Sequence, residues 1–276
     1  MSTGTDTPDG ARLTYVYAVG REGPALHGLT SRLPGVDGHP LYPVAADGLC
    51  ALVSRVPADT YGAQGLSAQL EDLARLEALA RAHHAVVDGA FAETSVLPMR
   101  LATVYLDDAR VAGMLVRRRA EFEDLLGRLE GHVELGMKVY ADPRAAGAPA
   151  PAAVTSTGAG AGRAYLQQRR ATRRRDQDAY RAASDLVVRA GELTRGVAAS
   201  RVVHRPQQGQ LASHSGVNVA NEAYLVPRAR TEELRRALTG LADGVPGVSV
   251  EVTGPWAPYS FATAPHAEDP AGGEGP

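Results

Sequence analysis

The sequence has few of the features on which disulfide frameworks and membrane spans are built. It holds one cysteine, Cys50, so no intrachain disulfide can form, and this is typical of a reducing compartment. No run of roughly 18 apolar residues is present, which argues against a transmembrane helix. Residues 1–10 are polar and lack the apolar core of a secretory signal. We therefore expect a cytoplasmic protein without a membrane partner.

The chain also lacks a strong charge imbalance. Its 276 residues carry a formal net charge of −2, so no overall field favours nucleic acid or an acidic membrane. Of the 29 basic residues only Lys138 is a lysine, and Arg, Ala, Gly and Pro are abundant, as in a chain encoded by GC-rich DNA. Abundant arginine is for that reason weak evidence of a phosphate-binding site.

Sequence motifs of catalytic, nucleotide and metal sites are missing. We find no P-loop, no His-Glu-x-x-His, no cysteine pair and no Gly-x-Ser-x-Gly. His83 and His84 are adjacent on a predicted helix, so their rings point about 100° apart and cannot share a metal from one face. We interpret them as one packed and one solvated histidine. The sequence predicts no enzyme activity, no cofactor and no metal, while a site assembled from dispersed residues stays an open alternative.

The patterned part of the chain is long enough for two domains of ordinary size. We expect an α+β protein with two α/β-type domains, at 12–130 and 131–262. Residues 1–11 and 263–276 are polar or rich in Gly and Pro, and we expect them to be disordered. The Ala-, Pro- and Gly-rich stretch 142–162 is expected to be a flexible insertion in the second domain.

In the first domain, apolar residues alternate or form short blocks at 13–19, 41–46 and 49–56, and these are expected strands. Steps of three and four predict an amphipathic helix from Leu66 to about Ala90, with Ser67 as its N-cap.

The stretch 96–105 is apolar but interrupted by Pro98 and Arg100, which predicts a bent strand at a sheet edge. Arg100 stands between apolar neighbours, where a charge needs a carboxylate or carbonyl partner. We favour a structural salt bridge over an anion site for Arg100. A further helix is expected from Asp107 or Asp108 to Leu129.

The second domain shows a clearer order of elements. Its pattern predicts, in turn, a strand at 133–140, a helix at 163–196, strands at 198–205 and 217–226, a helix at 230–242 and a strand at 247–253. This β-α-β-β-α-β order is the ferredoxin-like pattern.

The first part of the long helix, 163–181, is rich in arginine. Arg169 and Arg173, and likewise Arg170 and Arg174, are spaced i, i+4, which stacks like charges on one exposed side. Such a face could contact an acidic partner or RNA. The arginine bias and the neighbouring acidic residues favour a solvated face.

An aromatic segment follows the last expected strand, which we expect Gly254 and Pro255 to end. Trp256, Tyr259 and Phe261 lie in this segment, in a chain with one Trp and three Phe. We favour an aromatic plug that closes the core against the helices of the second domain. The alternative is an exposed anchor for a partner protein.

The residues 254–261, Gly-Pro-Trp-x-Pro-Tyr-Ser-Phe, resemble the C-terminal signature of the gas vesicle protein F/L family. Family members more often have Trp near Leu76 and Leu135, and Phe-Gly in place of Leu101-Ala102. Similar stretches recur along nearly the whole chain: Tyr15-Val16-Tyr17, Asp72 to Glu77, Ala80 to His84, Val96 to Val104, Gly162 to Leu166 and Asn221 to Val226.

The resemblance implies a non-enzymatic accessory protein of gas vesicle assembly, cytoplasmic and gas vesicle-associated. Its partners would be the hydrophobic shell protein and other accessory proteins, during nucleation or growth of the vesicle. Nucleic acid is not an expected partner. The alternative is an RNA-binding ferredoxin-like module that uses the helix at 163–181, although the strands lack the aromatic pair on which such modules stack bases.

Overall fold

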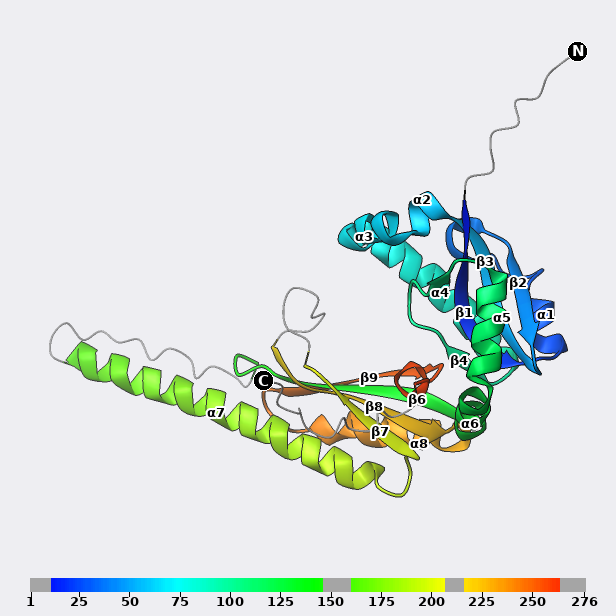
Figure 1. Cartoon of the computed structure of the whole chain (residues 1–276). Coiled ribbons are helices and arrows are strands. Elements are labelled where there is room, and N and C mark those ends of the chain that lie inside the picture. Colours follow the sequence, from blue (N-terminus) through cyan, green and yellow to red (C-terminus); the bar gives the residue numbers. More distant parts are fainter. Residues whose placement is uncertain (1–10, 146–159, 207–215, 264–276) are drawn as a thin grey trace, which may run out of the picture. The chain divides into compact units, whose positions relative to one another are not determined.

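The computed structural model describes residues 11–145, 160–206 and 216–263, which form two compact units (Figure 1). The first unit holds the described residues up to Gly131 and again from Ala257, and the second holds His132–Trp256. Residues 257–262, expected in the second domain, therefore pack with the first. The ends expected to be disordered, 1–11 and 263–276, lie almost entirely outside the described residues, as do residues 146–159 of the expected insertion 142–162. The last three residues of that expected insertion, 160–162, are instead the start of a helix.

A five-stranded sheet organises the first unit, with strand order β2-β3-β1-β4 and with β5 also paired to β1. All pairings are antiparallel. Its elements are, in chain order, β1 (Arg12–Arg21), α1 (Pro24–Leu29), η1 (Val36–Gly38), β2 (Leu41–Ala46), β3 (Leu49–Pro57), α2 (Ala58–Tyr61), α3 (Ala63–Glu71), α4 (Leu73–Glu93), β4 (Val96–Pro98), β5 (Val104–Tyr105), α5 (Asp108–Arg117), α6 (Arg119–Leu129) and η4 (Tyr259–Phe261).

The strand β1 lies inside this sheet and carries its most buried residues. It pairs with β3 along one edge and with β4 and β5 along the other. Residues from Tyr15 to Val19 are at most 1% exposed. Because both faces of β1 are covered, its sequence reads as a continuous apolar run in which two tyrosines bring hydroxyl groups into the core.

The single helix expected over residues 66–90 is two helices, α3 and α4. Asp72 separates them with an extended backbone, and its carboxylate accepts hydrogen bonds from the N–H groups of Ala74 and Arg75 at 2.9 and 3.2 Å. Asp72 is therefore the N-cap of the long helix, and the expected cap, Ser67, lies within α3. The helix that was expected to end at Leu129 is also divided into two helices, because Arg118 interrupts it between α5 and α6.

The stretch 96–105 bends more sharply than a single strand. It consists of β4 and β5 joined by a turn, in which Ala102 has φ 65°, the left-handed region that glycine adopts without strain. The N–H of Ala102 donates to the hydroxyl oxygen of Tyr15 at 3.1 Å, and the N–H of Val16 donates to the carbonyl of Thr103 at 2.9 Å. These bonds attach the turn to β1.

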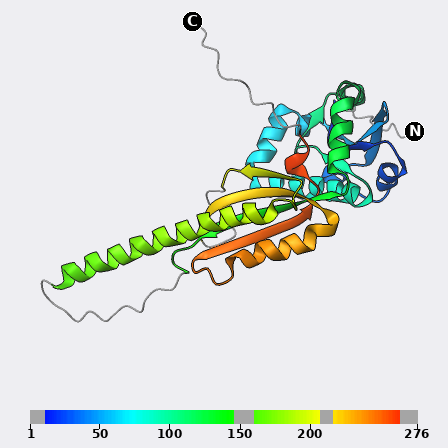
Figure 2. The same ribbon diagram turned by 90° about the horizontal axis from the view of Figure 1, so that it is seen from below.

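The second unit is a four-stranded antiparallel sheet of order β7-β8-β6-β9. This is the ferredoxin-like arrangement, so the predicted α+β class is confirmed. Two helices, α7 and α8, lie on one face of the sheet (Figures 1 and 2). The elements are β6 (His132–Ala141), α7 (Gly160–Thr194), β7 (Ser200–His204), β8 (Val217–Pro227), η2 (Arg228–Arg230), α8 (Thr231–Thr239), η3 (Gly240–Ala242) and β9 (Val248–Trp256).

The face of this sheet beneath α7 encloses a carboxylate. Glu222 is 2% exposed, and it accepts a hydrogen bond from Arg201 Nε at 2.9 Å and a second from the hydroxyl of Tyr224. A buried carboxylate without such donors would be costly, so these three side chains act as one polar group in an otherwise apolar layer.

The sequence predicts that Gly254 and Pro255 end the last strand. In the structure they instead form an irregularity within it. The pairing of β9 with β6 shifts register there, because Thr253 lies opposite Gly136 while Trp256 lies opposite Glu134. Gly254 has φ 101°, which suits glycine. The strand continues to Trp256, where the chain leaves the second unit.

Replacing Ala102 by glycine is expected to stabilise the first unit by about 1 kcal/mol, because an L-residue in the left-handed region carries a steric cost that glycine avoids. Urea unfolding at pH 7 measures the change. As a control, Ala78→Gly at an exposed position of α4 is expected to destabilise by about 1 kcal/mol. Equal destabilisation by both changes would contradict the assigned backbone strain.

Candidate interaction surfaces

Only part of the 35-residue helix α7 packs on its sheet. Ala179, Ala183, Leu186 and Ala190 are buried, whereas the side chains described between residues 163 and 174 are all exposed. The N-terminal part projects beyond the sheet in both ribbon views (Figures 1 and 2). We call residues 163–176 the α7 arm.

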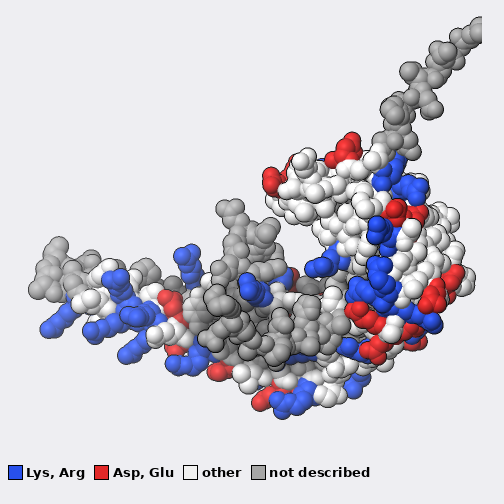
Figure 3. All heavy atoms as spheres, in the orientation of Figure 1, with Lys and Arg blue, Asp and Glu red and all other residues white. Residues whose placement is uncertain are grey.

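The α7 arm concentrates positive charge, visible as a run of basic side chains along the projecting helix (Figure 3). Within the described part of the chain, none of its arginines makes an ion pair, whereas Arg118, Arg201 and Arg230 each pair with a glutamate. The arm's arginines are Arg163, Arg169, Arg170, Arg173, Arg174 and Arg175.

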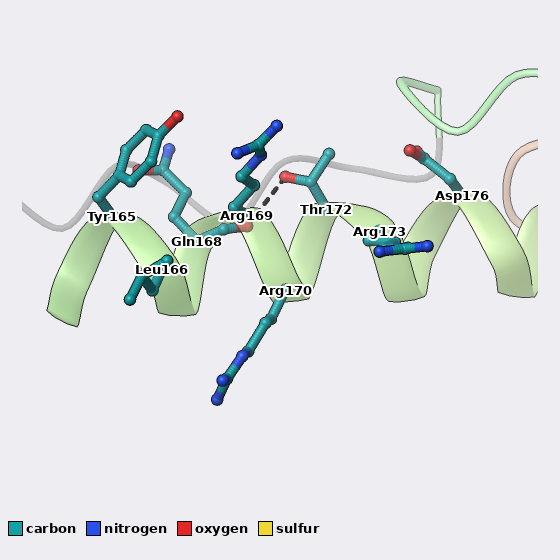
Figure 4. A pocket seen from close by; sticks show the side chains of 8 residues that line it. All are labelled: Tyr165, Leu166, Gln168, Arg169, Arg170, Thr172, Arg173 and Asp176. Carbon is teal, nitrogen blue, oxygen red and sulfur yellow. Dashed lines mark hydrogen bonds between the residues drawn. The ribbon is translucent and has the colours of Figure 1, made fainter. Parts of the chain in front are cut away.

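A hollow on the α7 arm is lined by residues of this one helix. Tyr165 and Arg169 point to one side of α7, and Arg170 points to the opposite side (Figure 4). Side chains that diverge from one helix do not enclose a small ligand, so we interpret the arm as a surface for a larger partner. The lining residues are Tyr165, Leu166, Gln168, Arg169, Arg170, Thr172, Arg173 and Asp176.

A second surface, which the sequence pattern does not predict, lies where α3 meets α4. The spacing of the apolar residues in this segment predicts one face of an amphipathic helix, but Leu70 is 41% and Leu73 is 65% exposed. Leu66 and Leu76 are half-buried. We call these four residues the α3–α4 corner. The buried residues of α4 start later, at Leu79.

The aromatic residues of the C-terminal segment are separated in the structure. Phe261 is buried at 4% exposure in the first unit, whereas Trp256 ends β9 and is 40% exposed. Tyr259 stacks on His84 of α4 with ring centroids 5.8 Å apart, and its hydroxyl lies 3.3 Å from His84 Nδ1. The expected plug against the helices of the second domain is therefore wrong for Tyr259 and Phe261, which pack in the first unit.

The two adjacent histidines of α4 have different environments. His83 is 3% exposed, while His84 is partly exposed and forms an ion pair with Asp88 at 3.0 Å when protonated. Both ring nitrogens of His83 are used, since Nδ1 lies 3.0 Å from the hydroxyl of Tyr15 and Nε2 lies 3.1 Å from the carbonyl oxygen of Met99.

One arrangement of protons satisfies every partner of His83. The hydroxyl oxygen of Tyr15 accepts from the N–H of Ala102, so its own proton is donated to His83 Nδ1. Nε2–H then donates to the carbonyl of Met99. This requires a neutral imidazole, and burial lowers the pKa of His83 to about 4. His83 is thus a structural hydrogen-bonding group with no nitrogen left for a metal.

Arg100 is exposed in the turn between β4 and β5, because that turn carries it out of the sheet. Its side chain makes no ion pair with any described carboxylate, so the structural salt bridge expected from its apolar neighbours is wrong. Its backbone carbonyl instead accepts from Thr103 Oγ1 at 2.7 Å and helps to close the turn.

Among the described residues, no three His, Cys, Asp or Glu side chains gather in a way that could hold a metal ion. None of the described helices combines the length and the apolar character needed to cross a bilayer.

Comparison with known proteins identifies a family that matches nearly the whole chain. The family described as gas vesicle synthesis protein GvpL/GvpF matches residues 13–263. Gas vesicle protein L from Streptomyces sp. (strain CB03234) is 42% identical over 254 residues, which cover 91% of this chain and 93% of that protein. Gas vesicle protein F from the same strain is 29% identical over 259 residues, which cover 90% and 98% of the two chains.

Solved structures show the same fold at low sequence identity. Gas vesicle protein GvpF from Microcystis aeruginosa has a TM-score of 0.63 at 18% identity, with 91% of this chain and 99% of that chain covered. GvpF from Anabaena sp. PCC7120 has a TM-score of 0.64 at 17% identity, with 92% and 98% covered.

Phe261→Ala is expected to lower the free energy of unfolding by about 3–5 kcal/mol, because it leaves a cavity in the first unit. Trp256→Ala should cost less than half as much, since Trp256 is already 40% exposed. Urea unfolding followed by circular dichroism compares the two. If Trp256→Ala is the more damaging change, the aromatic side chains are not distributed as described.

The buried His83 should make stability depend on pH. Its pKa is about 4 in the folded chain and about 6.5 in the unfolded chain, so between these values only the unfolded chain takes up the proton. Stability should therefore fall as pH is lowered from about 6.5 to 4, by up to roughly 3 kcal/mol from this group. His83→Gln, which cannot titrate, should show a shallower loss in urea titrations across this range. An unchanged slope would exclude His83 as the source.

Proposed function

Because its family match spans residues 13–263, the chain belongs to the GvpL/GvpF family of gas vesicle synthesis proteins, and we propose that it serves gas vesicle formation as a non-enzymatic adaptor for the hydrophobic shell protein. The resemblance read from the sequence is thereby confirmed. The family match carries the role in gas vesicle formation, and the α3–α4 corner supplies the physical basis for the proposed adaptor activity.

The α3–α4 corner has the chemistry that binding to an apolar partner requires. Leu70 and Leu73 are exposed although α3 and α4 pack against other parts of the unit. Each leucine buried against a partner contributes roughly 1.5–3 kcal/mol in proportion to the area that leaves water. An adaptor with such a corner would cover apolar surface of the shell protein until that protein joins the growing shell.

The buried polar groups of the first unit are used to hold its own elements together. The hydroxyl of Tyr17 donates to Ser54 Oγ at 3.0 Å and accepts from the N–H of Val36 at 2.9 Å. His83 and Tyr15 are similarly saturated by partners within the core. These side chains hold strands, turns and helices together, which is the task of structural groups.

RNA binding is the weaker candidate for the second unit. On the face of its sheet opposite the helices, the central strands carry Lys138, Asn221 and Ala223 at neighbouring positions. Tyr140 also lies on these strands, but it is 1% exposed and its hydroxyl donates to Glu251 at 3.0 Å. RNA-binding modules of this fold stack bases on exposed aromatic rings, which these positions do not offer.

Co-purification with the shell protein tests the adaptor role. Leu70→Ser/Leu73→Ser is expected to reduce the shell protein recovered with the chain at least tenfold, since two leucines leave the interface. A matched control in the same unit is Leu106→Ser/Val116→Ser, which removes two apolar side chains that are 68% and 53% exposed. The control should recover as much shell protein as the unaltered chain.

Both double variants should keep the thermal stability of the unaltered chain, because all four side chains are exposed. Equal recovery by the two variants would contradict the α3–α4 corner as the binding surface. Failure of the unaltered chain to retain any shell protein would contradict the adaptor role itself.

A further inference from the structure

We propose that the α7 arm is a docking site for an acidic helical segment of a partner protein. The site belongs to the second unit, and it is independent of the shell-protein adaptor role proposed for the α3–α4 corner. Three features of the arm support this. Its arginines form no ion pairs with described residues, its side chains do not pack on the sheet, and exposed apolar side chains lie beside the arginines.

The charge of the α7 arm is not compensated within the described chain. Arg169 and Arg173, and Arg170 and Arg174, stand one turn apart, and like charges at this spacing destabilise a helix. Among the described residues, Arg175 donates to the carbonyl of Ala171 and to Thr172 Oγ1, and to no carboxylate. The undescribed stretches nearest in sequence, 146–159 and 207–215, contain no acidic residue. Carboxylates from a partner would remove this repulsion.

The side chains of the α7 arm do not pack on the sheet, so tertiary contacts do not stabilise this part of the helix. A helix of its length, fewer than 15 residues, is marginal by itself in water, and here it is propagated from the packed half that begins near Ala179. Its exposed turns span about 20 Å, enough for a helical segment of about four turns to lie along it.

The docking face can be assigned from helical geometry. Tyr165, Leu166, Arg169, Arg170 and Arg173 follow the spacing i, i+1, i+4, i+5, i+8, so they form a band about 140° wide on the helix, with Tyr165 at one edge and Arg170 at the other. Tyr165 is 60% and Leu166 is 53% exposed at its outer end. The face thus offers an apolar contact followed by three guanidinium groups, each able to bind a carboxylate in a bidentate manner.

This composition fits a protein partner better than a nucleic acid. Arginine and tyrosine are the side chains that most often dominate binding energy in protein interfaces. Single-stranded nucleic acid would need several aromatic rings for stacking, and the docking face offers only Tyr165.

Fluorescence anisotropy on the full chain at physiological ionic strength tests the proposal with defined probes. The first probe is a labelled helical peptide of about 20 residues with glutamates spaced i, i+4 and leucines beside them. The second is the same peptide with glutamine at each glutamate position, and the third is a 20-nucleotide uridine RNA. The glutamate peptide is expected to bind at least tenfold more tightly than either other probe.

Charge reversal locates the binding face. Arg169→Glu/Arg170→Glu/Arg173→Glu should weaken binding of the glutamate peptide at least 30-fold, and Tyr165→Ser/Leu166→Ser about fivefold. The matched control is Arg110→Glu/Arg117→Glu/Arg128→Glu, which reverses three exposed arginines of α5 and α6. It changes the net charge equally and should alter binding less than twofold. Circular dichroism checks that all variants stay folded.

Several results would overturn the proposal. Equal binding of the glutamate and glutamine peptides would exclude recognition of carboxylates. Tighter binding of the RNA, lost on reversal of the three arm arginines, would assign the arm to nucleic acid. An equal loss of binding in the control variant would show an effect of net charge alone. Tighter binding after Glu268, Asp269 and Glu274 are changed to Gln would assign the arm to the chain's own acidic end.

Discussion

The first unit depends on hydrogen bonds to two tyrosine hydroxyl groups inside its sheet. Tyr15 and Tyr17 are completely buried on β1, and a buried hydroxyl without a partner would cost more than its burial contributes. The partners come from elements far apart in sequence: Ser54 on β3, His83 on α4, and the turn that contains Ala102. The hydrogen bonds to the two hydroxyl groups therefore hold β3, α4 and the turn between β4 and β5 against β1.

This constraint explains why the first unit can expose leucines at its α3–α4 corner and remain ordered. The long helix α4 is attached to the core by His83 and by the apolar residues that follow Leu79, and its start is fixed by the Asp72 cap. In the second unit, the buried Glu222 has a similar role for β7 and β8, since it receives bonds from Arg201 and Tyr224. In each unit a satisfied polar group helps to specify the fold, and an exposed segment remains for the binding that we propose.

Much of the fold could be predicted from periodicity. The strands β6 and β8 and the helix α7 have strong patterns, and their order predicts the ferredoxin-like sheet. The break at Asp72 could not be read from spacing, because Leu70, Leu73 and Leu76 keep helical steps across it. An aspartate followed by a helix-forming segment was the signal for a cap. The chain returns to the first unit at Ala257, and no local sequence pattern predicts this, because it depends on tertiary contacts.

The candidate surfaces were predictable to different degrees. Arg169, Arg170, Arg173 and Arg174 lie together on an exposed helix because helical spacing alone determines their placement. The separation of Trp256 from Phe261 was not predictable, since both belong to one aromatic segment and only the division into units distinguishes them. Exposure of the α3–α4 corner was also hidden, because leucines at helical spacing are usually buried.

Hydrogen–deuterium exchange of the full chain, with and without the shell protein, shows which surface the shell protein covers. If it binds the α3–α4 corner, backbone amides in α3 and the first two turns of α4, from about residue 63 to residue 80, exchange more slowly, while α5, α6 and the α7 arm exchange as before. Slower exchange confined to the α7 arm, with α3 and α4 unchanged, would rule out the corner as the binding surface.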